Sequence, residues 1–144
     1  MAPTPSPDWH ERRSPSLEEF EALAAQAYAR LPDTFRKLCE GLIVRVEDFP
    51  TEEVLKEMRA ESEFDLLGLF QGVGLPFRAE SGTTGEMPNM IWLYRRPILD
   101  YWAEHDDGLG AIVTHVLVHE IGHHFGLSDE DMEAIEQSAD TEKA

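Results

Sequence analysis

The most constraining feature of this sequence is one long apolar segment that runs directly into a cluster of histidines. Residues 109–118 read LGAIVTHVLV, and HEIGHHFG follows without a break. A surface helix repeats its apolar residues every three or four positions, whereas this run is almost continuous, so we predict a deeply buried helix. Glycine favours the left-handed conformation that ends many helices, which places the end near Gly126. We expect the rest of the chain to be organised around this helix.

The histidine end of this helix predicts a metal site. His119 and His123 lie four residues apart, so on an α-helix both imidazoles share one face, about 6 Å apart along the axis. Glu120 is turned by about 100° from His119, which suits it to hold a metal-bound water rather than to ligate. Two solvated histidines on an ordinary helix would give the same short pattern. The apolar run argues against that reading, because buried histidines beside a buried glutamate need partners to offset desolvation.

A third ligand is expected beyond the helix end. After the turn at Gly126, Asp129 can return toward the metal. Two histidines, one carboxylate and an open position for water make a catalytic rather than a structural zinc site, with Glu120 as the general base. Asp129 has a second reading, because Ser128 resembles an N-cap and acids are favoured in a first helical turn without any metal. Two further acids of the downstream segment are alternative ligands: Glu133 and Glu136.

Four segments together resemble a known protein family. They are HEIGHHFGLSD (residues 119–129), LPDTFRKLCEGLIVRVEDFP, LLGLFQGV and IWLYRRPI. In combination they are similar to the small bacterial zincin-like metallopeptidases sometimes called minimal zincins, over about residues 17–135. The resemblance implies a compact zinc metallopeptidase-like domain in which His119, His123 and Asp129 hold the zinc and Glu120 is the base. The pattern through Asp129 is also similar to the metzincin signature with aspartate as third ligand.

Composition limits the number of domains and the class of partner. A chain of 144 residues with 42% hydrophobic content supports one domain, which we place at residues 16–144 after a proline-rich, disordered tail at residues 1–15. The formal charge of −17 disfavours nucleic acid and anionic membranes, and leaves a peptide or protein as the expected substrate. The first residues lack the apolar core of a signal peptide, and no apolar run approaches about 18 residues, so we expect a cytoplasmic protein.

Hydrophobic periodicity predicts an α+β fold. Helices are expected at about residues 17–31, 33–40, 51–59, 97–104 and 109–126 and again after Gly126, and strands at residues 42–49, 66–71 and 90–95. The zincin resemblance implies a small twisted mixed sheet of three strands packed on the metal helix. In it, residues 42–49 would run parallel to residues 90–95, with residues 66–71 antiparallel at the free edge. We interpret residues 82–88 as a flap over the metal or, equally, as a plain surface loop.

Other polar side chains near this helix have weaker claims to a role. His115 lies about 12 Å along the axis from His123, too far for all three histidines to ligate one ion, so we interpret it as a support for the ligands or a core residue. His124 could steady an oxyanion or simply form a hydrogen bond near the helix end. Three residues are candidate donors to a tetrahedral intermediate, with none preferred: Tyr94, Arg95 and Arg96.

The function that this pattern predicts best is zinc-dependent hydrolysis of peptide bonds, with Glu120 activating the zinc-bound water. One alternative is a zinc-binding module that is catalytically weak or depends on a partner. A metal-dependent endoribonuclease has similar ligand spacing, but the glutamate after His119 and the negative charge argue against it. A peptidase must hold its substrate extended, and we expect a bound peptide to pair antiparallel with residues 67–70, where Gly68 leaves room for a close approach.

Overall fold

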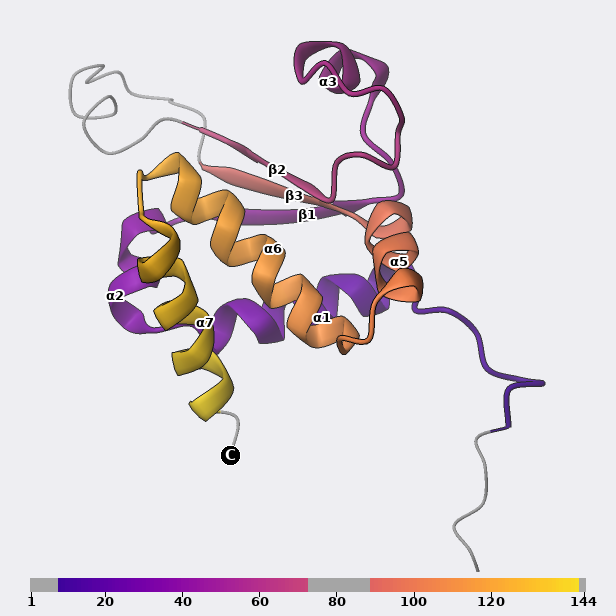
Figure 1. Cartoon of the computed structure of the whole chain (residues 1–144), viewed down its shortest axis with the longest axis horizontal. Coiled ribbons are helices and arrows are strands. Elements are labelled where there is room, and N and C mark those ends of the chain that lie inside the picture. The colour runs from indigo at the N-terminus through magenta and orange to yellow at the C-terminus, as the bar shows by residue number, and fades with distance from the viewer. Residues whose placement is uncertain (1–7, 73–88, 143–144) are drawn as a thin grey trace, which may run out of the picture.

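The computed structural model describes residues 8–72 and 89–142, so the flap predicted at residues 82–88 lies outside the described residues. Most of the helices lie on one side of one small sheet in these parts of the chain (Figure 1). In chain order the elements are α1 (Leu17–Ala29), α2 (Asp33–Arg36), a 3₁₀ turn (Lys37–Cys39), β1 (Ile43–Glu47), α3 (Glu52–Glu57), β2 (Gly68–Gln71), β3 (Met90–Tyr94), α5 (Arg95–Glu104), α6 (Leu109–His124) and α7 (Asp129–Glu142). The predicted α+β class is confirmed.

The three strands form a mixed sheet in the order β1-β3-β2. β1 runs parallel to β3, with Val44 opposite Ile91, and β2 runs antiparallel to β3, with Phe70 opposite the same Ile91. This arrangement confirms the expected strand directions. It also makes β2 an edge strand of this sheet, so one side of its backbone has no partner strand among the described residues.

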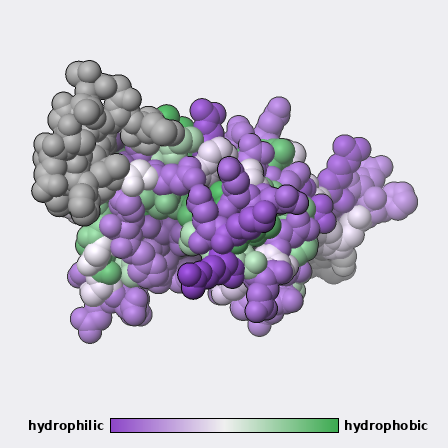
Figure 2. Space-filling view, turned by 90° about the horizontal axis from the view of Figure 1, so that it is seen from above, coloured by the Kyte–Doolittle hydropathy of each residue, from purple (hydrophilic) through white to green (hydrophobic). Residues whose placement is uncertain are grey.

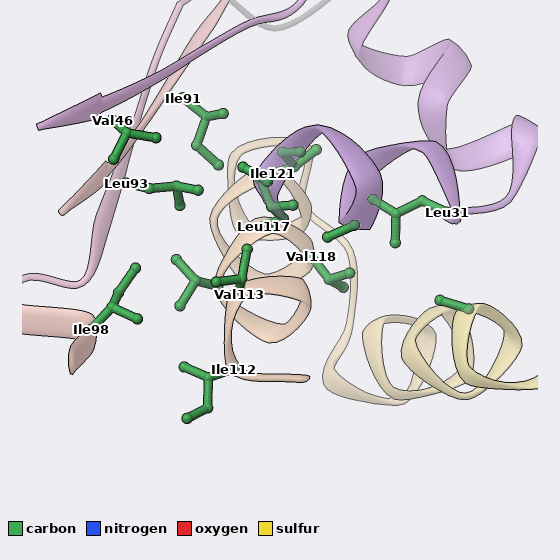
Figure 3. Close-up of a cluster of buried hydrophobic side chains, with 14 of the residues drawn as sticks. Leu31, Val46, Ile91, Leu93, Ile98, Ile112, Val113, Leu117, Val118 and Ile121 are labelled. Carbon is green, nitrogen blue, oxygen red and sulfur yellow. The ribbon is translucent and has the colours of Figure 1, made fainter. Parts of the chain in front are cut away.

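The hydrophobic core lies between the sheet and the two helices beneath it, α1 and α6 (Figure 1). Ile91 and Leu93 of β3 and Leu117 and Ile121 of α6 are each 0% exposed. Figure 3 shows these side chains meeting between β3 and α6. Burying one such side chain stabilises the fold by about 1.5–3 kcal/mol. The predicted central role of the 109–124 helix is therefore confirmed.

The end of α6 is a glycine-dependent turn that sends the chain back along the helix. Gly126 has a φ of 75°, Leu127 N–H donates to the Gly122 carbonyl at 2.9 Å, and Gly126 N–H donates to the His123 carbonyl at 3.2 Å. These two bonds define a Schellman motif. α7 then packs closely on α6, because a Cβ on Gly122 would lie 2.8 Å from Met132 Cγ.

The start of α1 is a capping box. Ser16 Oγ accepts from Glu19 N–H at 3.1 Å, and the Glu19 carboxylate accepts from Ser16 N–H at 3.0 Å.

Seen from above, the described surface is mainly hydrophilic, with small hydrophobic areas between (Figure 2). Within residues 8–72 and 89–142, no helix combines the length and apolar character needed to cross a bilayer.

Candidate active site

Three histidines of α6 lie on the part of the helix between the edge strand β2 and helix α7. At 100° per residue, Ile112, His115, His119 and His123 fall on one stripe of α6. On one side of this stripe, Gly68 of β2 lies against Val116 and Glu120, and on the other side α7 packs at Gly122. The stripe of three histidines therefore lies between the edge strand β2 and a helix rich in carboxylates, and we call this region the histidine groove.

The closest group of possible metal ligands in this groove consists of two histidines and one glutamate. Nitrogen atoms of His115 and His119 and an oxygen of Glu136 lie within 4.8 Å of one another. Glu136 comes from α7, where its Oε1 is 2.6 Å from His115 Nδ1 and its Oε2 is 3.9 Å from His119 Nε2. The close approach of α7 at Gly122 brings this carboxylate over the histidines.

His119 is the residue shared by this group and by the predicted pair. Its ring centroid lies 3.9 Å from that of His115 and 5.6 Å from that of His123. Burial lowers the pKa of His119, and the neighbouring His115 adds to this effect, while the Glu136 carboxylate opposes it. A lowered pKa favours the neutral imidazole, which is the form that binds metal.

Glu120 lies at the side of the groove beneath β2, away from the histidine stripe. A Cβ placed on Gly68 would be 3.5 Å from Glu120 Cγ, an ordinary contact, but only 2.8 Å from Val116 Cγ1, so the missing side chain lets β2 lie this close to α6. Burial raises the pKa of Glu120, and His123 partly counteracts the rise. A carboxylate with a raised pKa beside two histidines is a stronger base than an ordinary carboxylate and can both accept and return a proton.

Of the three predicted metal ligands, Asp129 has the least defined contacts. It is the first residue of α7 and is exposed, and its charge acts on His119 by raising the pKa of that imidazole. Ser128 caps the helix by accepting from Asp131 N–H at 3.1 Å, as the second reading of Asp129 expected. Among the described residues, Asp129 forms no ion pair with His119 or His123, and its role as a ligand stays a prediction.

The donor set in the groove fits a zinc ion. Imidazole nitrogen and carboxylate oxygen are both common zinc ligands, and around a tetrahedral ion at about 2.1 Å such atoms lie about 3.4 Å apart. The spread of 4.8 Å among His115, His119 and Glu136 is close to this spacing, so small side-chain rotations suffice. His123 lies one turn further along the same stripe, so it offers another nitrogen ligand next to His119.

Two features of the groove differ from what the sequence indicated. The histidines were expected to be buried, yet His123 is exposed and the His119 side chain is 25% exposed, because the apolar run of α6 faces the core with its other side. His115 is exposed, so its interpretation as a core residue is wrong, whereas its contact with Glu136 agrees with its interpretation as a support for the ligands. The spacing of four residues from His115 to His119 is the signal that could have indicated their proximity.

Two of the three candidate donors to a tetrahedral intermediate are engaged elsewhere: Arg95 in hydrogen bonds, and Arg96 over the Phe49 ring at 5.4 Å from its centroid. The Arg95 guanidinium donates to Pro15 O, Ser14 Oγ and Asp48 Oδ1 at 2.6, 3.0 and 3.0 Å, so it fastens the chain before α1. Tyr94 is 3% exposed, and burial with the charges of Glu47 and Glu120 raises its pKa to about 12. His124 stacks on Phe70 at 4.1 Å between ring centroids, which joins α6 to β2.

Comparison with known proteins gives one match. Residues 39–139 match the model of a family described as zincin-like metallopeptidase. The matched range runs from the 3₁₀ turn through the sheet and α6 into α7, so it includes every residue of the histidine groove. No curated protein matches the chain.

Proposed function

The chain belongs to the family of zincin-like metallopeptidases, and on this basis we propose that it hydrolyses peptide bonds with Glu120 as the proton shuttle. One observation carries the proposal: His119 with a lowered pKa, Glu120 with a raised pKa and the edge strand β2 adjoin one another along α6. Each of these is a part that amide hydrolysis requires. Family membership alone would leave the activity of this chain open.

We assign the metal to His119, His123 and one carboxylate of α7. Asp129 is the carboxylate that the motif predicts, whereas Glu136 has the oxygen nearer to His119 in the structure. His115 contacts Glu136 at 2.6 Å and so positions this carboxylate, whether Asp129 or Glu136 binds the metal. A zinc ion bound here supplies a Lewis acid that polarises the scissile carbonyl and lowers the pKa of a water molecule.

The residues of the chain then supply binding and proton transfer. A peptide lying antiparallel to β2 forms backbone hydrogen bonds with the free edge, so that its scissile bond passes over His119 and His123. Glu120 takes the proton of the attacking water and delivers it to the leaving amine. Burial beneath β2 supports this role, because it raises the pKa of Glu120 above that of an ordinary carboxyl group and so makes it a stronger base.

The test compares the zinc-loaded protein with Glu120→Gln on an unbiased peptide library, with new termini detected by mass spectrometry. We expect the variant to keep its fold and its zinc while its rate falls by about 10²–10⁴. Glu21→Gln, on the exposed side of α1, is the matched control and should cleave at the wild-type rate. Absence of cleavage by the zinc-loaded wild type would overturn the peptidase proposal and leave a zinc-binding module.

A further inference from the structure

Beyond His115 the histidine groove adjoins a pocket that shares His115 and Glu136 with the proposed metal site and whose other lining residues have no part in the proposed chemistry. This pocket has a volume of about 460 Å³ and lies where β2 begins, α5 ends and α6 and α7 face each other. Volumes of about 300–1,000 Å³ are typical of sites that enclose a ligand, so one long amino-acid side chain fits easily. We call it the acidic pocket, after three of its lining residues: Asp107, Glu133 and Glu136.

The walls of the acidic pocket divide into an apolar part and a charged part. Leu67, Ile112 and Val116 supply apolar surface on the side of β2 and α6, whereas the three carboxylates come from α7 and the segment before α6. No arginine or lysine is among its lining residues in the described chain. Glu136 is held by His115. Asp107 and Glu133 have no hydrogen bond or ion pair within the described residues.

This division matches one class of ligand, a long aliphatic stem that ends in a positive charge. Arginine and lysine bury their methylene groups along apolar surface while the cationic head seeks an anion. A carboxylate accepts a guanidinium through charge-assisted bonds, which are stronger than neutral ones. An acidic side chain would instead be repelled by Asp107 and Glu133.

The position of the acidic pocket fixes which substrate residue reaches it. Leu67 lines the pocket and directly precedes β2, while Phe70 near the other end of β2 stacks on His124. A peptide antiparallel to β2 therefore runs from the level of His124, over His119 and His123, toward Leu67. The side chains that reach the pocket follow the scissile bond in the sequence of the substrate.

We propose that the acidic pocket is a specificity site for a basic side chain, arginine or lysine, on the C-terminal side of the scissile bond. The proposal rests on the peptidase function proposed above for the direction and position of the substrate. The pocket itself, as a binding site for a cationic side chain, rests on its own walls and charges. Binding and cleavage can therefore be tested separately.

The binding test uses the zinc-loaded Glu120→Gln protein, which should hold peptides without cleaving them. Isothermal titration calorimetry compares a blocked ten-residue alanine peptide with one central arginine and the same peptide with citrulline, which has the same shape without the charge. We expect the arginine peptide to bind roughly 10-fold to 100-fold more tightly. Adding Asp107→Asn and Glu133→Gln should remove most of that preference.

A matched control separates the pocket from the overall charge. Asp106→Asn with Glu21→Gln removes the same two charges from exposed positions that do not line the pocket, and the arginine preference should persist. Equal binding of the two peptides to the Glu120→Gln protein, or no measurable binding of either, would overturn the proposal. A preference that survives loss of both Asp107 and Glu133 would overturn it as well.

The wild-type library digest then tests the direction. Arginine or lysine should be enriched just after the cleaved bonds, and enrichment before those bonds instead would show that the placement is wrong. An arginine preference in calorimetry without any cleavage by the wild type would contradict the peptidase function alone. The pocket would then stand as a binding site for cationic side chains.

Discussion

Replacement of Gly68 by alanine should disturb both stability and catalysis, because this glycine sets the distance between β2 and α6. A Cβ at Gly68 would lie 2.8 Å from Val116 Cγ1 and 3.0 Å from the Trp92 carbonyl oxygen. Carbon atoms in contact are normally about 3.5–4.0 Å apart, so β2 would have to move by roughly 0.7–1.2 Å. Overpacking of this kind costs about 1–3 kcal/mol, and the reduced entropy of the unfolded chain offsets about 0.4–1 kcal/mol.

We therefore expect Gly68→Ala to lower the free energy of unfolding by about 1–2 kcal/mol, measured by urea denaturation. A displacement of about 1 Å above Glu120 should also reduce kcat for peptide cleavage, by as much as about 100-fold, with zinc retained. Gly110→Ala is the matched control, since its Cβ would meet Leu23 Cδ1 at an ordinary 3.8 Å. That change should keep activity and add up to about 1 kcal/mol. Wild-type stability and kcat in Gly68→Ala would refute the reasoning.

Three further changes test other parts of the site. Glu136→Gln should weaken zinc binding by more than the roughly 10-fold to 100-fold typical of a residue that only supports a ligand. Zinc affinity is measured by competition with a chelator. A larger loss of zinc affinity in Asp129→Asn than in Glu136→Gln would make Asp129 the ligand instead. Gly126→Ala should lower the free energy of unfolding by about 1 kcal/mol, because alanine must adopt a φ of 75° there; an unchanged urea midpoint would contradict the assigned turn. Burial lowers the pKa of His119 and His124 from about 6.5. As the pH falls through this value, the unfolded chain binds more protons than the folded chain, so the metal-free protein should lose stability. The loss should be smaller in His124→Gln. Equal stability of the wild type at pH 7.5 and 5.5 would contradict this reasoning.

Local patterns in the sequence were sufficient for most of the fold. The glycine at position 126 acts within a few residues, and the turn there has the hydrogen bonds that end a helix at glycine. The directions of the three strands were implied by the family resemblance and are confirmed. Helix and strand ends shifted by a few residues, and the helix expected at residues 33–40 divides into α2 and a 3₁₀ turn.

The candidate site was predictable only in the part that lies on one helix. The spacing of His119 and His123 places both on one stripe, whatever the tertiary structure. The contact between His115 and Glu136 joins residues 21 positions apart, and it depends on how closely α7 packs at Gly122. The acidic pocket likewise combines residues of four segments. No periodicity in a single sequence encodes such distances, which is why Glu136 stood only as an alternative ligand.

Zinc content is the most direct test of the central claim, that α6 provides a metal site through its histidines. Protein loaded with zinc and then dialysed should contain about one zinc per chain by elemental analysis. The double variant His119→Ala with His123→Ala should lose the metal while remaining folded by circular dichroism. His10→Ala with His105→Ala removes two histidines outside the groove and should retain it. Full zinc occupancy in the first double variant would contradict the account.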